Sequence, residues 1–247
     1  MKKLLSFILV GLVFVLSGCA PQNDGLFHQL LVEPFIIFIK FFADFFDGSY
    51  GMGIILVTLC VRILMMPLMF YSFKKQRKAQ FRMKKFKPEI DAINKKMKEA
   101  ATPEEQNMYT RELMALHRKN GTSPINSGCL PILIQMPILT ALYFAISHND
   151  ELGSQNFLWF NLGTPDMSMA LIAAFLYYVQ VKLSMKYLPE DTPAQMKMMT
   201  YISPLMILIP SLSLPAAMPL YWAAGAFVAM LQQYLSNRYF DYEEEIE

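Results

Sequence analysis

Five apolar segments, each about as long as a bilayer is thick, constrain what this chain can fold into. A helix that crosses the hydrocarbon core needs about 20 mainly apolar residues. Segments of this kind lie at residues 51–73, 129–147, 168–186, 198–214 and 218–236. The composition agrees, because 54% of the residues are hydrophobic and 17% are charged, against about 25% charged in soluble domains. We therefore expect an all-α polytopic membrane protein with five transmembrane helices.

The distribution of basic residues predicts the orientation of these spans. Residues 74–128 contain 14 of the 22 Lys and Arg of the chain, whereas residues 149–167 contain none. Cytoplasmic loops carry the excess of Lys and Arg, so we expect 74–128 inside and the connection 148–167 outside. The loop 187–197 and the acidic tail 237–247 then also lie in the cytoplasm.

The first 18 residues have the features of a secretory signal peptide. Two lysines precede an apolar stretch, which ends in Leu16-Ser17-Gly18-Cys19. These four residues resemble the bacterial lipobox, in which the cysteine receives a lipid and becomes the mature N-terminus. We expect cleavage after residues 1–18 and a lipid attached to Cys19 outside the cell membrane. An ordinary signal peptide that is cleaved elsewhere is the alternative.

The outer segment 19–50 contains an apolar stretch that is too short to be a convincing span. Residues 33–46, EPFIIFIKFFADFF, are interrupted by Lys40 and Asp44. As a span, this stretch would reverse the orientation of everything that follows and place the basic segment outside. We therefore expect an amphipathic helix that lies in the outer membrane interface.

The basic segment 74–128 has the pattern of an antiparallel helical hairpin. Apolar residues recur at helical spacing in two stretches, 86–97 and 109–116. Thr102 is placed to cap the second helix at its N-terminus, and Gly121 is suited to end it. The hairpin is either a solvated loop or a docking site for anionic lipid, the ribosome or a nascent chain. Charge alone does not separate these interpretations.

Arg62 is the residue of the spans that least suits a lipid environment. It lies near the middle of 51–73, where an arginine costs roughly 2.5–3.5 kcal/mol to insert. The spans contain no Asp or Glu that could pair with it. An unpaired guanidinium at that depth needs water, carbonyl groups or a transient acidic partner. We therefore expect Arg62 to face a hydrated cavity, with Thr58, Gln135 and Gln180 as candidate walls.

These residues also have plainer interpretations. A glutamine in a span can serve only as a hydrogen bond between helices, and Trp222 suits the aromatic belt of a membrane interface. Met65, Met66 and Met69 continue the face of Arg62, where methionine serves either plain packing or an adaptable apolar surface. Pro67 is expected to bend the helix just beyond the charge.

Two long motifs resemble the YidC family of membrane protein insertases. They are VTLCVRILMMPL at 57–68 and GCLPILIQMPILTALYFAI at 128–146, with the basic hairpin between them and LPAAMPLYW at the start of the last span. The resemblance covers essentially the whole chain after the signal peptide. It is closest to the five-span lipoprotein form of single-membrane bacteria.

The resemblance implies an insertase and chaperone, not an enzyme. Its implied clients are nascent membrane proteins, with lipoproteins among them, which it handles alone or with the Sec translocon. The spans of the family enclose a hydrophilic groove that is open to the cytoplasm and to lipid but closed outside. The groove positions that the resemblance implies are Arg62, Gln135, Gln180 and Trp222. From the residues themselves we add Thr58 and Tyr221 to the groove, and Met65, Met66 and Met69 as an apolar face along which a client slides.

The expected partners and cofactors follow from the same features. The chain ends NRYFDYEEEIE, and such an acidic tail is repelled by the phosphates of ribosomal RNA. Docking of the ribosome must then use the basic hairpin 74–128 or the connection 187–197, and the hairpin is also the expected contact for the signal recognition particle. We expect no DNA partner, no metal, no cofactor and no catalytic residues, because the sequence offers no phosphate-binding loop and no nucleophile–base pair.

A transporter of small solutes or anions is the rival interpretation, in which Arg62 binds the substrate. It predicts paired broken helices or an internal repeat. We find no convincing repeat, and five spans do not divide into two halves.

Overall fold

The structure is a computed structural model that describes residues 25–121, 130–186 and 194–239. The expected signal peptide, Cys19, most of the loop 187–197 and the acidic end of the tail lie outside these ranges. What we expect of them therefore stays a prediction.

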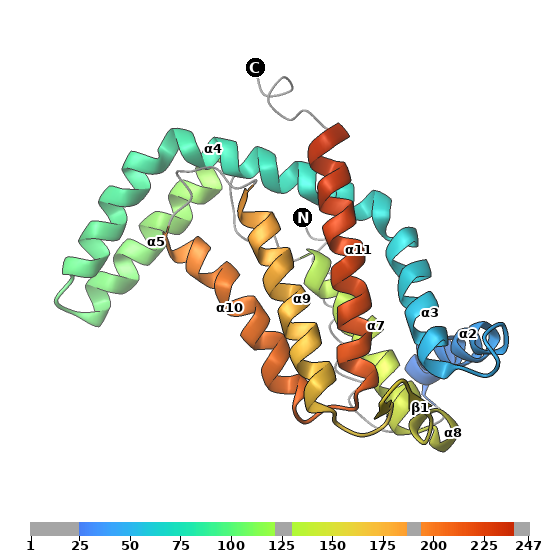
Figure 1. The fold of residues 1–247 in the computed structure, drawn as a ribbon. Coiled ribbons are helices and arrows are strands. Elements are labelled where there is room, and N and C mark those ends of the chain that lie inside the picture. Colours follow the sequence, from blue (N-terminus) through green and yellow to red (C-terminus); the bar gives the residue numbers. More distant parts are fainter. Residues whose placement is uncertain (1–24, 122–129, 187–193, 240–247) are drawn as a thin grey trace.

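The described residues are mainly helical (Figure 1). In chain order the elements are η1 (His28–Val32), α2 (Glu33–Asp44), α3 (Tyr50–Leu64), α4 (Met66–Glu99), α5 (Pro103–Lys119), α7 (Leu130–Ser147), α8 (Asp150–Gly153), β1 (Asn156–Phe157), β2 (Phe160–Asn161), α9 (Met167–Lys186), α10 (Ala194–Ser211) and α11 (Ala217–Tyr239). The helical fold class is thus confirmed, apart from two strands of two residues each.

Helices lie on all five apolar segments, but length and hydropathy single out fewer of them as spans. Within the described ranges, α9 is long and apolar enough to cross a membrane by itself. If α3 and Met66–Lys75 are taken as one span, they are also long and apolar enough to cross a membrane, although they are bent by 53°. Gln135–Ser147 and Thr200–Ser211 are shorter apolar helices. The count of five spans therefore stays a prediction.

The long helices form a bundle in which α11 packs against both α3 and α9, and α9 also packs against α10. The largest apolar core lies toward the end where α2, α3 and α7 meet α8, and it includes Ile39, Ile54 and Leu142. A Cβ atom at Gly53 would lie 2.4 Å from the backbone oxygen of Ile39. Only glycine therefore allows α2 to pack so closely on α3.

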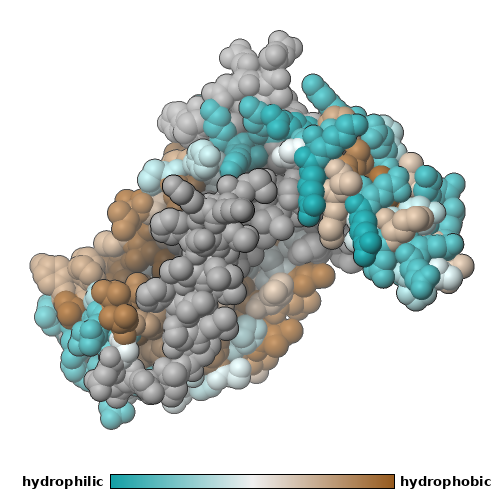
Figure 2. Space-filling view, turned by 180° about the vertical axis from the view of Figure 1, so that it is seen from behind, coloured by the Kyte–Doolittle hydropathy of each residue, from teal (hydrophilic) through white to brown (hydrophobic). Residues whose placement is uncertain are grey.

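The surface of the molecule separates into hydrophilic and hydrophobic parts. Figure 2 shows hydrophilic residues on the projecting α4–α5 hairpin and hydrophobic residues over much of the bundle. Large apolar side chains are exposed on α9, α10 and α11, among them Phe175, Met206 and Phe227. Such a surface suits a helical bundle surrounded by lipid.

The first apolar segment is broken where the sequence predicts a bend. Met65 separates α3 from α4, and Pro67 stands in the first turn of α4. Proline has no N–H to donate to the carbonyl of Ile63, so the helix cannot continue unchanged through this point. Beyond the break, α4 runs without interruption from the apolar segment into the basic hairpin. The boundary that we expected at residues 73 and 74 is therefore not a helix end.

The second helix of the hairpin begins and ends as the sequence predicts. The Thr102 hydroxyl accepts a hydrogen bond from the Glu105 backbone N–H at 3.2 Å, and the Glu105 carboxylate accepts one from the Ala101 backbone N–H at 3.0 Å. Gly121 follows α5 with a φ of 63°, in the left-handed region that glycine adopts readily. The capping predictions for Thr102 and Gly121 are confirmed.

The connection 148–167 contains structure that the sequence did not predict. Asn149 caps the short helix α8 by accepting a hydrogen bond from the Leu152 backbone N–H at 3.2 Å. β1 and β2 then pair in antiparallel fashion, and the Ala217 backbone N–H bonds to the Leu162 carbonyl at 3.0 Å. Leu152 and Leu162 are fully buried. The connection is thus folded against the beginning of α11.

Candidate functional site

Arg62 lies in the last turn of α3, three residues before the break at Met65. Side chains on a helix lean toward its N-terminus, so the guanidinium extends back along α3 into the bundle. It packs on the backbone of α11 at Gly225, where a Cβ atom would lie 2.6 Å from Arg62 Nη2. The charge therefore lies between α3 and α11.

The groups around the guanidinium are neutral. Tyr177 on α9 accepts a hydrogen bond from Arg62, and the Tyr221 hydroxyl on α11 lies within reach of its charge. The Arg62 Nε atom is buried without a hydrogen-bond partner. Among the described residues, no carboxylate lies within ion-pair distance of Arg62.

Gln135 joins this cluster from a third helix. Its Nε2 atom donates a hydrogen bond of 2.5 Å to the Tyr221 hydroxyl, which links α7 to α11. Tyr221 is 2% exposed. The structure thus brings Arg62, Gln135 and Tyr221 together, although Gln135 and Tyr221 are 86 residues apart in the chain.

Gln180 lies on α9, one helical turn beyond Tyr177 and on the same face. Its Oε1 atom is buried without a hydrogen-bond partner. Buried polar atoms normally have partners, so a buried acceptor without one is a feature that needs explanation. The cluster accordingly contains one donor, Arg62 Nε, and one acceptor, Gln180 Oε1, that no described group satisfies.

Thr58 and Trp222 are buried beside the cluster. The Thr58 hydroxyl donates a hydrogen bond of 2.7 Å to the Ile54 carbonyl of its own helix, so it is already satisfied. Trp222 belongs to the apolar core at the start of α11 and is 6% exposed. Trp222 is thus packed inside the protein.

The three methionines lie on both sides of the helix break. Met65 is the residue between the helices, whereas Met66 and Met69 belong to α4. α4 is turned by 53° relative to α3, so a bend lies between Arg62 and the two methionines of α4. Met69 is buried, while Met65 and Met66 are partly exposed.

Two residues that contact Arg62, Tyr177 and Gly225, were not singled out from the sequence, whereas the contact of Gln232 is the hydrogen bond between helices that a glutamine in a span can make. The Gln232 Nε2 atom donates a hydrogen bond of 3.2 Å to the Arg62 carbonyl, and its side chain is buried. Helical spacing was the available signal. Tyr177 precedes Gln180 by three residues, and Tyr221, Gly225 and Gln232 are separated by four and seven residues on one face of α11.

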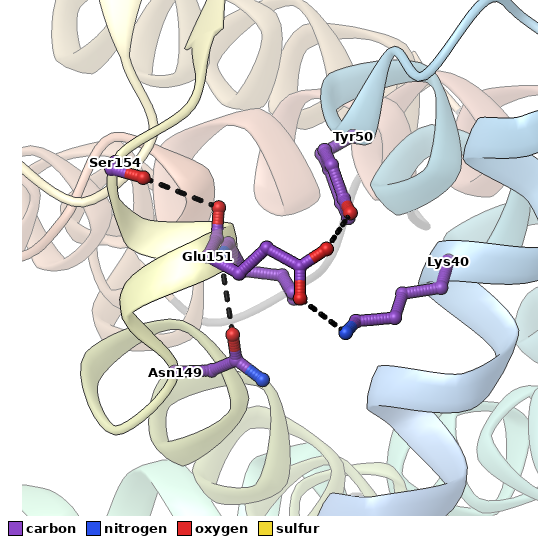
Figure 3. A network of polar contacts seen from close by, with 6 residues as sticks. Lys40, Tyr50, Asn149, Glu151 and Ser154 are labelled. Atoms are coloured by element: carbon purple, nitrogen blue, oxygen red, sulfur yellow. Dashed lines mark hydrogen bonds and ion pairs between the residues drawn. The ribbon is translucent and has the colours of Figure 1, made fainter.

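A second polar cluster lies on the far side of the core, where α2, α3 and α8 meet (Figure 3). The Glu151 carboxylate accepts hydrogen bonds from Lys40 Nζ and from the Tyr50 hydroxyl. The bond from Lys40, followed by that from Tyr50, lowers the pKa of Glu151. The bond to Glu151 is the main reason that the pKa of Tyr50 is raised to about 12. We call Lys40, Tyr50 and Glu151 the outer clasp.

The described residues contain no group of three or more His, Cys, Asp or Glu side chains that could hold a metal ion. The Arg62 cluster itself consists of a fixed positive charge with hydroxyl and amide groups around it. Such a set can attract and hydrogen-bond a polar or acidic chain.

Fold and site together define a helical protein whose bundle holds an arginine that has no carboxylate partner among the described residues, and known membrane proteins match its sequence and fold. Residues 41–244 match the family model described as 60Kd inner membrane protein. The chain is 43% identical over 245 residues to membrane protein insertase YidC 2 of Listeria monocytogenes serotype 4b (strain F2365), covering 96% of this chain and 89% of that one.

Two further similarities agree. Membrane protein insertase MisCB of Bacillus subtilis (strain 168) is 45% identical over 218 residues, covering 85% of this chain and 79% of that one. The crystal structure of an active YidC insertase, with its first transmembrane domain resolved, matches with a TM-score of 0.58 and 26% identity. That match covers 92% of this chain and 50% of the crystallised one, so this chain spans half of its length.

The chain belongs to the YidC family of membrane protein insertases. It is accordingly a protein of the bacterial cell membrane. These relatives are named insertases, and none of the similarities favours the transporter interpretation.

Proposed function

We propose that the chain inserts membrane proteins, and helps them fold, through a hydrophilic groove centred on Arg62. The groove is enclosed by five spans, opens to the cytoplasm and to lipid, and is closed on the outer side. Membership of the insertase family supports the proposed activity. The polar cluster formed by α3, α7, α9 and α11 supports the proposed location of the groove.

The proposed mechanism begins with the hydrophilic outer segment of a nascent membrane protein, which is often acidic. This segment enters from the cytoplasm and is attracted by Arg62, while Gln135, Gln180 and water replace part of its hydration. Hydrogen-bonding groups inside a membrane lower the cost of a polar chain that has crossed halfway. Thr58, Tyr221 and Trp222 complete the wall of the groove.

The apolar span of the client then leaves sideways into lipid along α3, α9 and α11. Met65, Met66 and Met69 form the flexible apolar surface along which it slides, because methionine packs against many shapes. Transfer of the apolar span into lipid drives release. The process needs no nucleotide and no covalent intermediate.

The proposed topology follows the charge distribution. Residues 1–18 are removed, the lipid on Cys19 anchors the N-terminus outside, α2 lies in the outer interface, and the C-terminus is cytoplasmic. The α4–α5 hairpin is then cytoplasmic, where its basic residues can meet the ribosome or the signal recognition particle. The Sec translocon is the proposed partner for clients that the chain does not insert alone, and lipoproteins are proposed among its clients.

One observation carries this proposal: Arg62 has neutral neighbours and, among the described residues, no carboxylate partner. A buried arginine that served only to stabilise the bundle would be expected to have a counter-ion. Arg62 is thus available to a charge that arrives with the client.

The test replaces Arg62 with Ala and, separately, with Lys in cells depleted of the native protein. Insertion of a client with an acidic outer tail should fail with Arg62→Ala and largely survive with Arg62→Lys. A matched client whose outer tail is neutral controls for general damage to the bundle. Normal insertion of the acidic client by Arg62→Ala would refute the proposed charge attraction.

A further inference from the structure

Gly225 lies near the middle of α11, where glycine is less favourable than alanine for a helix. The three atoms nearest to a Cβ at this position all belong to one side chain. They are Arg62 Nη2 at 2.6 Å, Nε at 3.2 Å and Cζ at 3.3 Å. The guanidinium thus lies directly over the backbone of α11, in space that any other residue would fill.

A second contact on the same face of α11 holds the other end of Arg62. Gln232 donates a hydrogen bond to the Arg62 carbonyl, seven residues beyond Gly225. At 1.5 Å per residue, the two positions are about 10 Å apart along α11. The backbone of Arg62 is thus held at Gln232, while its head group rests at Gly225.

The contact at Gly225 differs from ordinary close packing of helices. Small residues between membrane helices usually let two backbones approach, as at Gly53, where the nearest atom is the Ile39 backbone oxygen. At Gly225 the nearest atoms are those of a charged head group. Glycine there makes room for the charge of Arg62 and not for a helix.

We propose that Gly225 is a positioning residue that seats the Arg62 guanidinium and sets the depth of its charge in the membrane. This inference rests on the proposed function of Arg62. An arginine in a bilayer tends to extend its head group toward the interface. The close packing on Gly225 and the hydrogen bond that Arg62 donates to Tyr177 hold the head group in the bundle without neutralising it.

The test is the variant Gly225→Ala, assayed with an acidic-tailed client and with its neutral-tailed counterpart. The added methyl group displaces the guanidinium, so insertion of the acidic client should fall several-fold while that of the neutral client stays unchanged. In the Arg62→Lys background, Gly225→Ala should cause little further loss, because an ammonium group has no planar fork that needs the space.

Gly53→Ala is the matched control, since it creates a clash of similar size against a backbone atom. It should lower the thermal stability of the purified protein and reduce insertion of both clients equally. If Gly225→Ala itself fails to fold, restoration of folding by Arg62→Lys supports the seat, and failure in both backgrounds overturns it.

Two results would refute the proposed positioning role of Gly225 and leave the proposed charge attraction by Arg62 intact. One is normal insertion of the acidic client by Gly225→Ala when Arg62→Ala fails. The other is an equal loss with both clients, which would assign Gly225 to helix packing. Normal insertion by Arg62→Ala would instead refute the proposed function itself.

Discussion

Lys40 and Arg62 are two cations of the same molecule in opposite situations. Lys40 lies in the outer clasp and pairs with Glu151, and the side chains of the two are 38% and 53% exposed. Arg62 is half-buried between helices and, among the described residues, has no carboxylate partner. Lys40, which water could solvate, thus has an ion-pair partner, whereas Arg62, which lies in the bundle, has none among the described residues.

In the function that we propose, this difference separates a structural contact, at Lys40, from a functional one, at Arg62. An exposed ion pair contributes little to stability, because water and salt screen it. The outer clasp therefore aligns α2, α3 and α8 more than it stabilises them. Arg62 is held by Tyr177, Gly225 and Gln232, which are all neutral. These contacts fix the position of the guanidinium, while its charge stays available to an acidic segment of a client.

The largest expected effect comes from giving Arg62 the kind of partner that Lys40 has. Tyr177→Glu places a carboxylate next to the guanidinium, where a close ion pair in a medium of low dielectric is strong. We expect insertion of an acidic-tailed client to fall to the level of Arg62→Ala, as measured in depleted cells. Insertion of a neutral-tailed client should change little.

Tyr177→Gln is the control for this prediction, because it removes the aromatic hydroxyl without adding charge. It should retain most of the insertion of the acidic client. If Tyr177→Glu also inserts that client normally, Arg62 does not act through an unpaired charge, and the contrast with Lys40 has no functional meaning.

A smaller effect is expected from Gln232→Leu, which removes the hydrogen bond to the Arg62 carbonyl but keeps a side chain of similar size. Loss of a buried polar partner destabilises a protein by about 1–3 kcal/mol. We expect a fall of that order in the free energy of unfolding of the purified protein, measured by denaturation in detergent.

Ser184→Ala is the comparison for Gln232→Leu. It removes a hydrogen bond of 2.7 Å from Ser184 Oγ to Gln233 Oε1, which also joins α11 to another helix but does not involve Arg62. Its expected cost is that of an ordinary bond between membrane helices, about 0.6 kcal/mol. Equal costs for the two variants would contradict a special role of Gln232 at the helix break.

The smallest effect is expected at the outer clasp and depends on pH. The pKa of Glu151 is lowered in the folded protein, so its contribution is present above the ordinary value and is lost as the pH falls through the lowered pKa. The pKa of Tyr50 is raised from 10.0 to about 12. Its contribution is present below pH 10 and is lost as the pH rises from 10 to about 12.

Glu151→Gln should flatten both limbs of a plot of thermal stability against pH, with only a small loss near neutrality. Glu104→Gln changes an exposed glutamate of α5 outside the clasp, and it should leave both limbs unchanged. An ultraviolet titration of tyrosine should show one group fewer with a raised pKa in Glu151→Gln. An unaltered titration would show that Glu151 does not hold Tyr50.

Features set by neighbouring residues could be predicted from the sequence. The apolar segments form helices, Pro67 stands at a break, and Thr102 caps α5. Each depends on groups within one or two turns of chain. The absence of Asp and Glu from the apolar segments is equally visible in the sequence, and it was sufficient to single out Arg62. The family could be inferred from two continuous motifs.

Tertiary structure alone decided which groups meet Arg62. Tyr177, Gly225 and Gln232 come from α9 and α11, far from α3 in the chain, and their contacts depend on which face each helix presents. A helical pattern places residues on a face but does not identify the helix opposite. The outer clasp likewise exists only because α2, α3 and α8 meet in space. The sequence thus determines that the apolar segments offer Arg62 no carboxylate, whereas packing determines where its charge lies and which groups meet it.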